Sequence, residues 1–136
     1  MAHQARSAQY FKIEVPDKPG EAVRMLNVLR GAGINLLAFH GFPRRRKSQL
    51  DLVPEDPAPL VALAKRAGWK LSAPKTCFVI SGDDRAGALA DALGQLGRAK
   101  VNVLAATGVA AGEGRFGAIV WVDSRSVKKA AKAFAL

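Results

Sequence analysis

The sequence contains two copies of one pattern, separated by a constant shift. Phe11 and Phe78 stand 67 residues apart, and so do Gly20 and Gly87. The same shift aligns further pairs without a gap: Ile13 with Ile80, Asp17 with Asp84, Leu26 with Leu93, Leu29 with Leu96, Asn35 with Asn102, Gly41 with Gly108, Val53 with Val120, Asp56 with Asp123, Leu60 with Val127 and Ala64 with Ala131. A shift that holds through loops and apolar segments alike indicates a duplication, so one fold has to be built twice.

Each copy alternates strand-like and helix-like segments in the same order. Residues 10–15 (YFKIEV) and 76–81 (TCFVIS) are rich in aromatic and β-branched residues and predict first strands. Residues 21–32 and 88–99 place apolar side chains on one helical face. Second strands are predicted within 34–42 and 101–109 and third strands at 49–53 and 116–122, and further helices open at Asp56 and Asp123, which suit N-caps.

A fourth strand at 69–73 completes the first copy as βαββαβ, so the predicted class is α+β, with two ferredoxin-like repeats. This topology gives antiparallel sheets with both helices on one face. Trp69 aligns with Leu136, where the sequence ends, so the second repeat lacks its last strand. The predicted organisation is an N-terminal tail at 1–9, a first repeat at 10–73 and a second repeat at 76–136.

The missing strand leaves an open sheet edge beside Cys77. Unpaired backbone groups on such an edge need a cover. Three covers remain open from the sequence: the strand at 69–73, the segment before Tyr10, or a strand from a second chain.

Composition narrows the functional class. Hydrophobic residues make up 49% and charged residues 24% of the 136, as in ordinary globular proteins. No apolar run reaches the roughly 18 to 20 residues of a membrane span, and the N-terminus has no apolar stretch of a secretory signal, so we expect a cytoplasmic protein without membrane contact. One cysteine and two histidines argue against a disulfide scaffold or a metal site. Without a catalytic triad or phosphate loop, we expect no enzyme and no cofactor.

The formal charge of +10 raises the alternative of a nucleic-acid-binding module on the same topology. Charge gathers at 44–47 (RRRK) and 128–132 (KKAAK). In RNA-recognition modules the third strand carries stacking aromatics; here Phe116 and Gly117 fit that motif, but Ala118 stands at the second aromatic position and Asp51 lies on the matching strand of the first copy. Base stacking is therefore disfavoured, while non-specific phosphate contact through 44–47 stays open.

The corner PDKPG, its helix and the following GINLLAF resemble the ACT domain, a small amino-acid-binding regulatory module, and GDDRAG with KVNVLAA resembles it again. The resemblance runs from Tyr10 to about Phe134. It implies a non-catalytic regulator, homodimeric, with a separate metabolic enzyme or regulator as a further partner. It also implies amino-acid ligands where the first loop of one unit meets the second strand of its neighbour, at Asp17, Pro19, Gly20, Ile34, Asn35, Asp84, Gly87, Val101 and Asn102.

The chemistry of these corners suits a zwitterion. A helix that begins after glycine presents free N–H groups and a positive dipole end to a carboxylate, and a nearby aspartate accepts an ammonium group. A purely structural role stays open, because Asp17 suits a cap, Pro19 a first helical turn and Gly20 a tight corner, and Asn35 can satisfy a loop.

The two corners also depart from the family pattern. Val15 and Gly82 occupy positions where some ACT domains carry a histidine, and Ala86 replaces Pro19 in the second copy. The two sites are therefore expected to differ in affinity or in ligand. A further alternative from the sequence is that one of the two sites binds no ligand.

Overall fold

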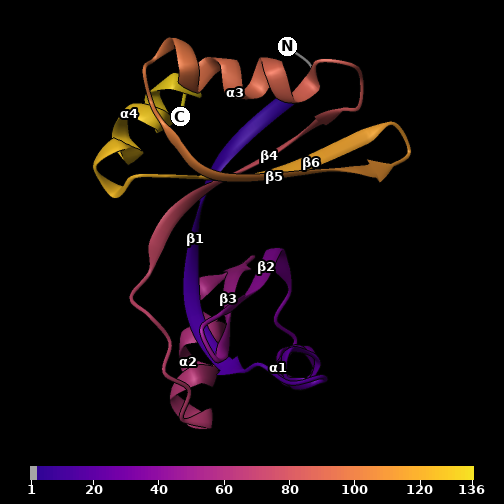
Figure 1. The fold of residues 1–136 in the computed structure, drawn as a ribbon, viewed down its shortest axis with the longest axis vertical. Helices are drawn as coiled ribbons and strands as arrows, with labels where there is room; N and C mark the ends of the chain where they lie inside the picture. The colour runs from indigo at the N-terminus through magenta and orange to yellow at the C-terminus, as the bar shows by residue number, and fades with distance from the viewer. Residues whose placement is uncertain (1–2) are drawn as a thin grey trace. The chain divides into compact units, whose positions relative to one another are not determined.

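The structure is a computed structural model, and it describes residues 3–136. The chain forms two compact units. The first-copy unit is Gln9–Lys75, and the second-copy unit combines residues 3–8 with Thr76–Leu136. Figure 1 shows α3 and α4 on one side of the second-copy strands, as the ferredoxin-like topology requires.

The first-copy unit contains the second half of strand β1 (His3–Pro16), helix α1 (Glu21–Gly31), strands β2 (Leu36–Arg44) and β3 (Lys47–Pro54), and helix α2 (Pro57–Ala67). The strands are ordered β2-β3-β1, and both ladders are antiparallel. Phe11 stands opposite Leu52, and Gly41 stands opposite Leu50. Asp56 caps α2 as predicted, because its carboxylate accepts the Ala58 N–H at 3.3 Å.

The second-copy unit contains the first half of β1, strand β4 (Lys75–Asp83), helix α3 (Ala88–Arg98), strands β5 (Val103–Gly112) and β6 (Arg115–Val122), and helix α4 (Val127–Ala133). The strand order is β1-β4-β6-β5. Asp123 accepts the Arg125 N–H at 2.9 Å, but it caps a 3₁₀ turn at Ser124–Ser126 rather than the helix itself. The predicted second helix of this copy therefore begins later, at Val127.

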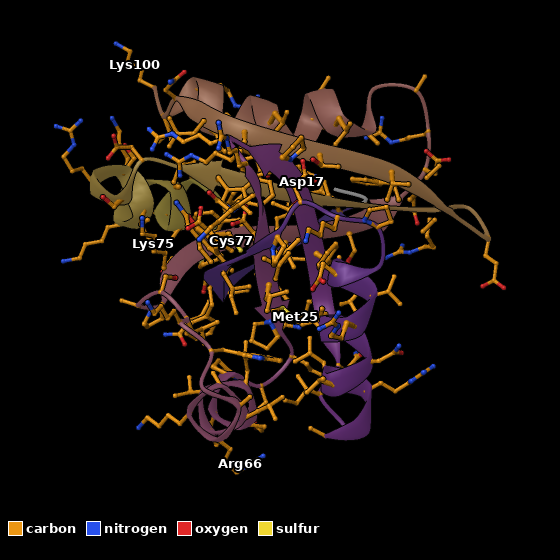
Figure 2. The ribbon with its side chains drawn as sticks, turned by 60° about the horizontal axis from the view of Figure 1, so that its bottom comes forward. Asp17, Met25, Arg66, Lys75, Cys77 and Lys100 are labelled. Atoms are coloured by element: carbon orange, nitrogen blue, oxygen red, sulfur yellow. The ribbon has the colours of Figure 1, made fainter. Side chains whose placement is uncertain are left out.

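The duplication is reproduced in the backbone. Helices α1 and α3 are each 11 residues long and begin at equivalent positions, Glu21 and Ala88. At the end of α1, Gly33 adopts a φ of 71°, and Lys100 adopts the same left-handed conformation after α3, with a φ of 59°. The Lys100 side chain points outward in Figure 2. The predicted α+β class with two ferredoxin-like repeats is thereby confirmed.

Each unit has its own hydrophobic core between its helices and one sheet face. Met25 on α1 is buried against the first core, and it is labelled in Figure 2. The period-2 alternation of β1, β3, β4 and β6 supplies most of the remaining core. The largest fully buried side chains are Phe11, Leu29, Leu52 and Leu60 in the first unit and Phe78, Ile80, Leu96 and Val120 in the second.

The predicted fourth strand at 69–73 is wrong, because no strand forms there. The segment does run beside β1, where the Ser72 N–H donates to the Lys12 carbonyl at 2.9 Å. In return, the Lys12 N–H donates to the Ser72 hydroxyl at 2.8 Å, and not to a backbone carbonyl. A side chain thus takes the place of the second ladder bond, and Pro74 has no N–H with which to extend pairing.

The prediction of an N-terminal tail at 1–9 is wrong from His3 onward, because these residues belong to β1. Met1 and Ala2 lie outside the described residues. The first half of β1 neighbours β4, and Ala5 packs against the second core. The segment before Tyr10 is therefore the cover of the open edge beside Cys77, and neither 69–73 nor a second chain is needed there.

Candidate functional site

Both predicted corners have the same geometry. Gly20 and Gly87 precede their helices with φ values of 87° and 85°, a left-handed conformation that other residues adopt only at a cost. No side chain caps either helix. The left-handed backbone therefore explains glycine at both positions without any ligand.

The N-terminus of α3 leaves donors free. The Ala88 N–H donates to the Arg85 carbonyl at 3.1 Å, and the first bond within the helix runs from the Asp91 N–H to Gly87 at 2.9 Å. Among residues 3–136, the intervening N–H groups of Leu89 and Ala90 have no acceptor. These two donors lie at the positive end of the helix dipole.

A cavity of about 330 Å³ opens beside these donors, between the start of α3 and strands β5 and β6. Gly108 and Leu89 both line it, and the glycine leaves room for the Leu89 side chain, because a Cβ atom there would approach the Leu89 Cδ1 atom to 2.7 Å. Phe116, which is 4% exposed, also lines the cavity. The complete lining is Asp84, Arg85, Gly87, Ala88, Leu89, Ala90, Gly108, Val109, Ala110 and Phe116.

The charged groups on the rim differ in their availability. Arg85 forms an ion pair with Asp91 on α3 and also donates to the Ala86 carbonyl at 3.2 Å. The hydrogen bond from Arg85 lowers the pKa of Asp91 below its ordinary value. Asp84 uses its backbone N–H on the Gly114 carbonyl at 2.8 Å, while its carboxylate has no partner within residues 3–136. Asp84 is therefore the rim group that can accept a new cation.

The polar residues predicted to bind the first-copy ligand already have partners within the chain. The Ser48 hydroxyl donates to the Asp17 carboxylate at 3.0 Å, and the Asn35 side-chain amide donates to Glu55 at 2.9 Å. The Glu55 N–H also donates to the Asn35 carbonyl at 2.9 Å. Pro19 lies exposed in the loop. These contacts agree with the structural alternative that the sequence left open for Asp17 and Asn35.

The predicted residues on the second strands lie away from the corners. Val101 is 6% exposed within the second core, and Ile34 packs partly against the first. The Val101 N–H donates to the Leu96 carbonyl at the C-terminal end of α3, and the Ile34 N–H donates to the Leu29 carbonyl at the C-terminal end of α1. A helix of 11 residues is about 16 Å long at about 1.5 Å per residue, so exposed Asn102 and the Gly87 corner lie at opposite ends of one unit. One unit therefore does not bring them together.

The cavity floor was missed from the sequence, although a signal was present. Gly108 is the repeat partner of Gly41, and a glycine at equal positions of two strands marks a close approach of side chains. In the first copy that approach is to Leu50, whose Cδ2 atom would lie 3.0 Å from an added Cβ. From the sequence, Phe116 is related only to the stacking motif of RNA-recognition modules.

The structure removes the aromatic ring that supported the comparison with RNA-recognition modules. Phe116, the one aromatic that matches the stacking motif, belongs to the hydrophobic core and does not face solvent. In the first copy, Asp51 is 5% exposed and accepts the Gln49 side-chain amide at 3.0 Å. Neither third strand thus offers an exposed stacking platform.

Residues 3–136 meet the requirements of neither a metal site nor a membrane-spanning helix. No group of three or more His, Cys, Asp or Glu side chains in this range is placed to hold a metal ion. His40 packs its ring against Phe42, with centroids 5.3 Å apart. No helix in the same range is both long enough and apolar enough to cross a membrane.

Solved structures share this fold. A protein from Bacteroides thetaiotaomicron superposes with a TM-score of 0.81 at 21% identity, over 96% of this chain and 88% of that one. The ligand-free regulatory subunit of aspartate kinase from Thermus thermophilus has a TM-score of 0.65 at 18% identity, over 99% and 95%. That of Thermus flavus has a TM-score of 0.55 at 20% identity, over 99% and 95%.

These similarities concern the fold. Neither a family model nor a curated protein matches the sequence. The ACT-like fold inferred from the two corners is confirmed by the regulatory subunits, which the chain covers almost completely.

Proposed function

We propose that the chain binds a free amino acid in the second-copy cavity and acts as a non-catalytic regulator. The observation that supports this is the pairing of opposite polarity at the two sides of the cavity. The free N–H groups of Leu89 and Ala90 suit a carboxylate, and the Asp84 carboxylate suits an ammonium group. A volume of about 330 Å³ lies at the small end of ligand pockets, which range from about 300 to 1,000 Å³.

The floor of the cavity favours an apolar ligand side chain. Gly108, Ala110 and Phe116 contribute no charged or polar side chain to it. The one cationic rim residue, Arg85, is already paired with Asp91. An acidic ligand side chain would lack a free partner there, so the aliphatic and aromatic amino acids are the expected class.

In this proposal, the predicted residues at the C-terminal end of α3 contact the ligand that is bound by a second copy of the chain. Asn102 is exposed and carries both a donor and an acceptor. In a homodimer, the start of β5 in one chain would complete the corner site of the other. Ligand binding would then change how the chain pairs with itself or with a separate enzyme.

The homodimer is proposed to form along β5. This strand is at a sheet edge, so one side of its backbone is unpaired. It carries no charged residue in a chain with a formal charge of +10, and it exposes Leu104 and Val109 at 63% and 62%. An uncharged edge is where two such chains can approach with the least repulsion.

Replacing Val109 with lysine is expected to dissociate the dimer. A two-fold interface along β5 brings the same strand of both chains together, and facing like charges cost several kcal/mol, so we expect at least a tenfold weaker association. Light scattering over a concentration series measures this. The control is Val23→Lys, because Val23 is similarly exposed at 58% but lies on α1. A monomeric parent chain, or an unchanged Val109→Lys dimer, would contradict the proposal.

Thermal unfolding with each of the twenty amino acids tests the ligand. An amino acid at 100 times its Kd is expected to stabilise the chain by about 2.7 kcal/mol. Gly108→Val is expected to remove this shift, since its side chain fills the cavity floor and displaces Leu89. Asp84→Asn is expected to weaken binding by removing the partner of the ammonium group.

The matched control is Thr107→Val, which introduces the same side chain one position earlier, on the opposite face of β5. It is expected to respond to amino acids as the parent chain does. The proposal fails if no amino acid at millimolar concentration raises the melting temperature, or if Gly108→Val responds as strongly as Thr107→Val.

A further inference from the structure

The turn between β2 and β3 carries four consecutive cationic residues, 44–47, and all four are exposed. We call this turn the basic hairpin. Arg45 adopts a left-handed conformation at its tip, with a φ of 61°. Among residues 3–136, none of these four side chains forms an ion pair. Their charge is therefore uncompensated by the protein.

The sheet register places the basic hairpin beside the first corner. Lys47 stands opposite Pro16, the last residue of β1, and Arg44 stands opposite Lys47. The next residue, Ser48, donates its hydroxyl to the Asp17 carboxylate at 3.0 Å. The basic hairpin and the loop that leads into α1 thus lie at the same end of the first-copy sheet.

One arginine of the basic hairpin is held in place by hydrogen bonds to side chains of β3. Arg44 donates to the Gln49 side-chain oxygen at 3.2 Å, and Gln49 donates to Asp51 at 3.0 Å. Gln49 and Asp51 are only 6% and 5% exposed, so the chain of hydrogen bonds is fixed within the sheet. Burial, and then the charge of Lys75, lower the pKa of nearby Lys12, with Arg44 contributing in the same direction. Arg44 is oriented by a neutral partner and keeps its charge for another group.

The equivalent place in the second copy has the opposite character. Its turn contains Glu113 and Arg115, and Arg115 is paired with Asp83 at 2.9 Å. Counting corner and turn together, three carboxylates there (Asp83, Asp84, Glu113) face two arginines (Arg85, Arg115), each already in an ion pair. In the first copy, five cationic residues (Lys18, Arg44, Arg45, Arg46, Lys47) face two carboxylates (Asp17, Glu21). The two copies therefore have the same backbone fold but opposite net charge at the corner and turn.

We propose that the basic hairpin is a binding site for a small phosphate-bearing anion, distinct from the amino-acid cavity of the second copy. Three adjacent arginines provide planar donors that match phosphate oxygens in bidentate geometry. The four charges are concentrated in one short turn, and β3 carries no aromatic residue for base stacking, which favours a compact anion over a nucleic-acid strand bound along the third strand. The exposed rings of this hairpin, Phe39 and Phe42, lie on β2. The inference does not rest on amino-acid binding, because it concerns other residues in the other unit.

Calorimetric titration with inorganic pyrophosphate tests this site. The hairpin variant, Arg44→Gln with Arg45→Gln and Arg46→Gln, is expected to bind pyrophosphate at least about tenfold more weakly, because it loses the charge-assisted hydrogen bonds of three guanidinium groups. The matched control is Lys128→Gln with Lys129→Gln and Lys132→Gln on α4, three exposed lysines of the second-copy unit. It removes the same charge at another place and is expected to change affinity less than about twofold.

The comparison separates a site from general attraction. Equal losses in both variants would mean that pyrophosphate responds only to net charge, and the proposal would be overturned. No detectable binding by the parent chain would overturn it as well. A single-stranded RNA oligomer serves as the third arm: if it binds through the basic hairpin more tightly than pyrophosphate does, the site is for nucleic acid and not for a small anion. Far-ultraviolet circular dichroism verifies that both variants are folded.

Discussion

Deleting residues 3–8 is expected to unfold the second-copy unit or to open it at β4, while Gln9–Lys75 keeps its strands. These six residues are the first half of β1 and cover one side of β4. Each lost backbone hydrogen bond costs about 0.5 to 1.5 kcal/mol, and a newly exposed edge adds a risk of aggregation. A loss of several kcal/mol is a large part of the roughly 5 to 15 kcal/mol that stabilises a domain.

Cys77 provides the measurement, because it is the only cysteine of the chain and is fully buried on β4. The full chain is expected to react slowly with a thiol reagent and the truncated chain rapidly. Gln4→Ala with Arg6→Ala is the control, since it changes exposed side chains of the same strand and keeps its backbone bonds. If truncation yields no soluble protein, Ala5→Pro in the full chain should also speed the reaction. Unchanged Cys77 reactivity in both would mean that this segment does not protect β4.

Replacing Phe78 with alanine is expected to have the second large effect. Phe78 is fully buried, and its ring packs against Phe134 with centroids 5.4 Å apart at a tilt of 53°. Removal of a buried phenylalanine costs about 3 to 5 kcal/mol, and a tilted aromatic pair adds about 0.5 to 1.5 kcal/mol. Its repeat partner Phe11 is 1% exposed in the other core and should cost a similar amount when truncated.

Hydrogen exchange locates the damage from each substitution. Phe78→Ala is expected to reduce amide protection across Thr76–Leu136, and Phe11→Ala across Gln9–Lys75. Phe42→Ala is a control at a surface position that is 36% exposed, where loss of the ring contact with His40 is expected to cost about 0.5 to 1.5 kcal/mol, less than either core substitution. Uniform loss of protection in both units from either core substitution would contradict separate cores.

The corner that resembles the ACT domain has different surroundings in the two copies. In the first copy, Asp17 and Asn35 are bonded to Ser48 and Glu55, and a cationic turn stands beside Asp17. In the second copy, the equivalent Asp84 has a free carboxylate at the rim of a cavity. The residue types recur, but their neighbours in space do not.

Features that depend on local pattern could be predicted from the amino-acid sequence alone. The shift between Phe11 and Phe78 predicted two units, and apolar periodicity predicted α1 and α3 to within one residue of their observed ends. Gly20 suited a tight corner, and the φ values of 87° at Gly20 and 85° at its repeat partner Gly87 agree with that structural role. Such features follow from nearest neighbours along the chain, so they can be read before folding.

Features that depend on distant segments could be seen only in the folded chain. Strand β1 continues back to His3 and covers β4, although its first half lacks the β-branched residues that mark a strand. The cavity arises where Gly108 faces Leu89 across the helix–sheet packing. Strand pairing is a backbone interaction whose partner is chosen by the available edge, and a cavity exists only after the cores have packed, so neither is encoded in a local run of residues.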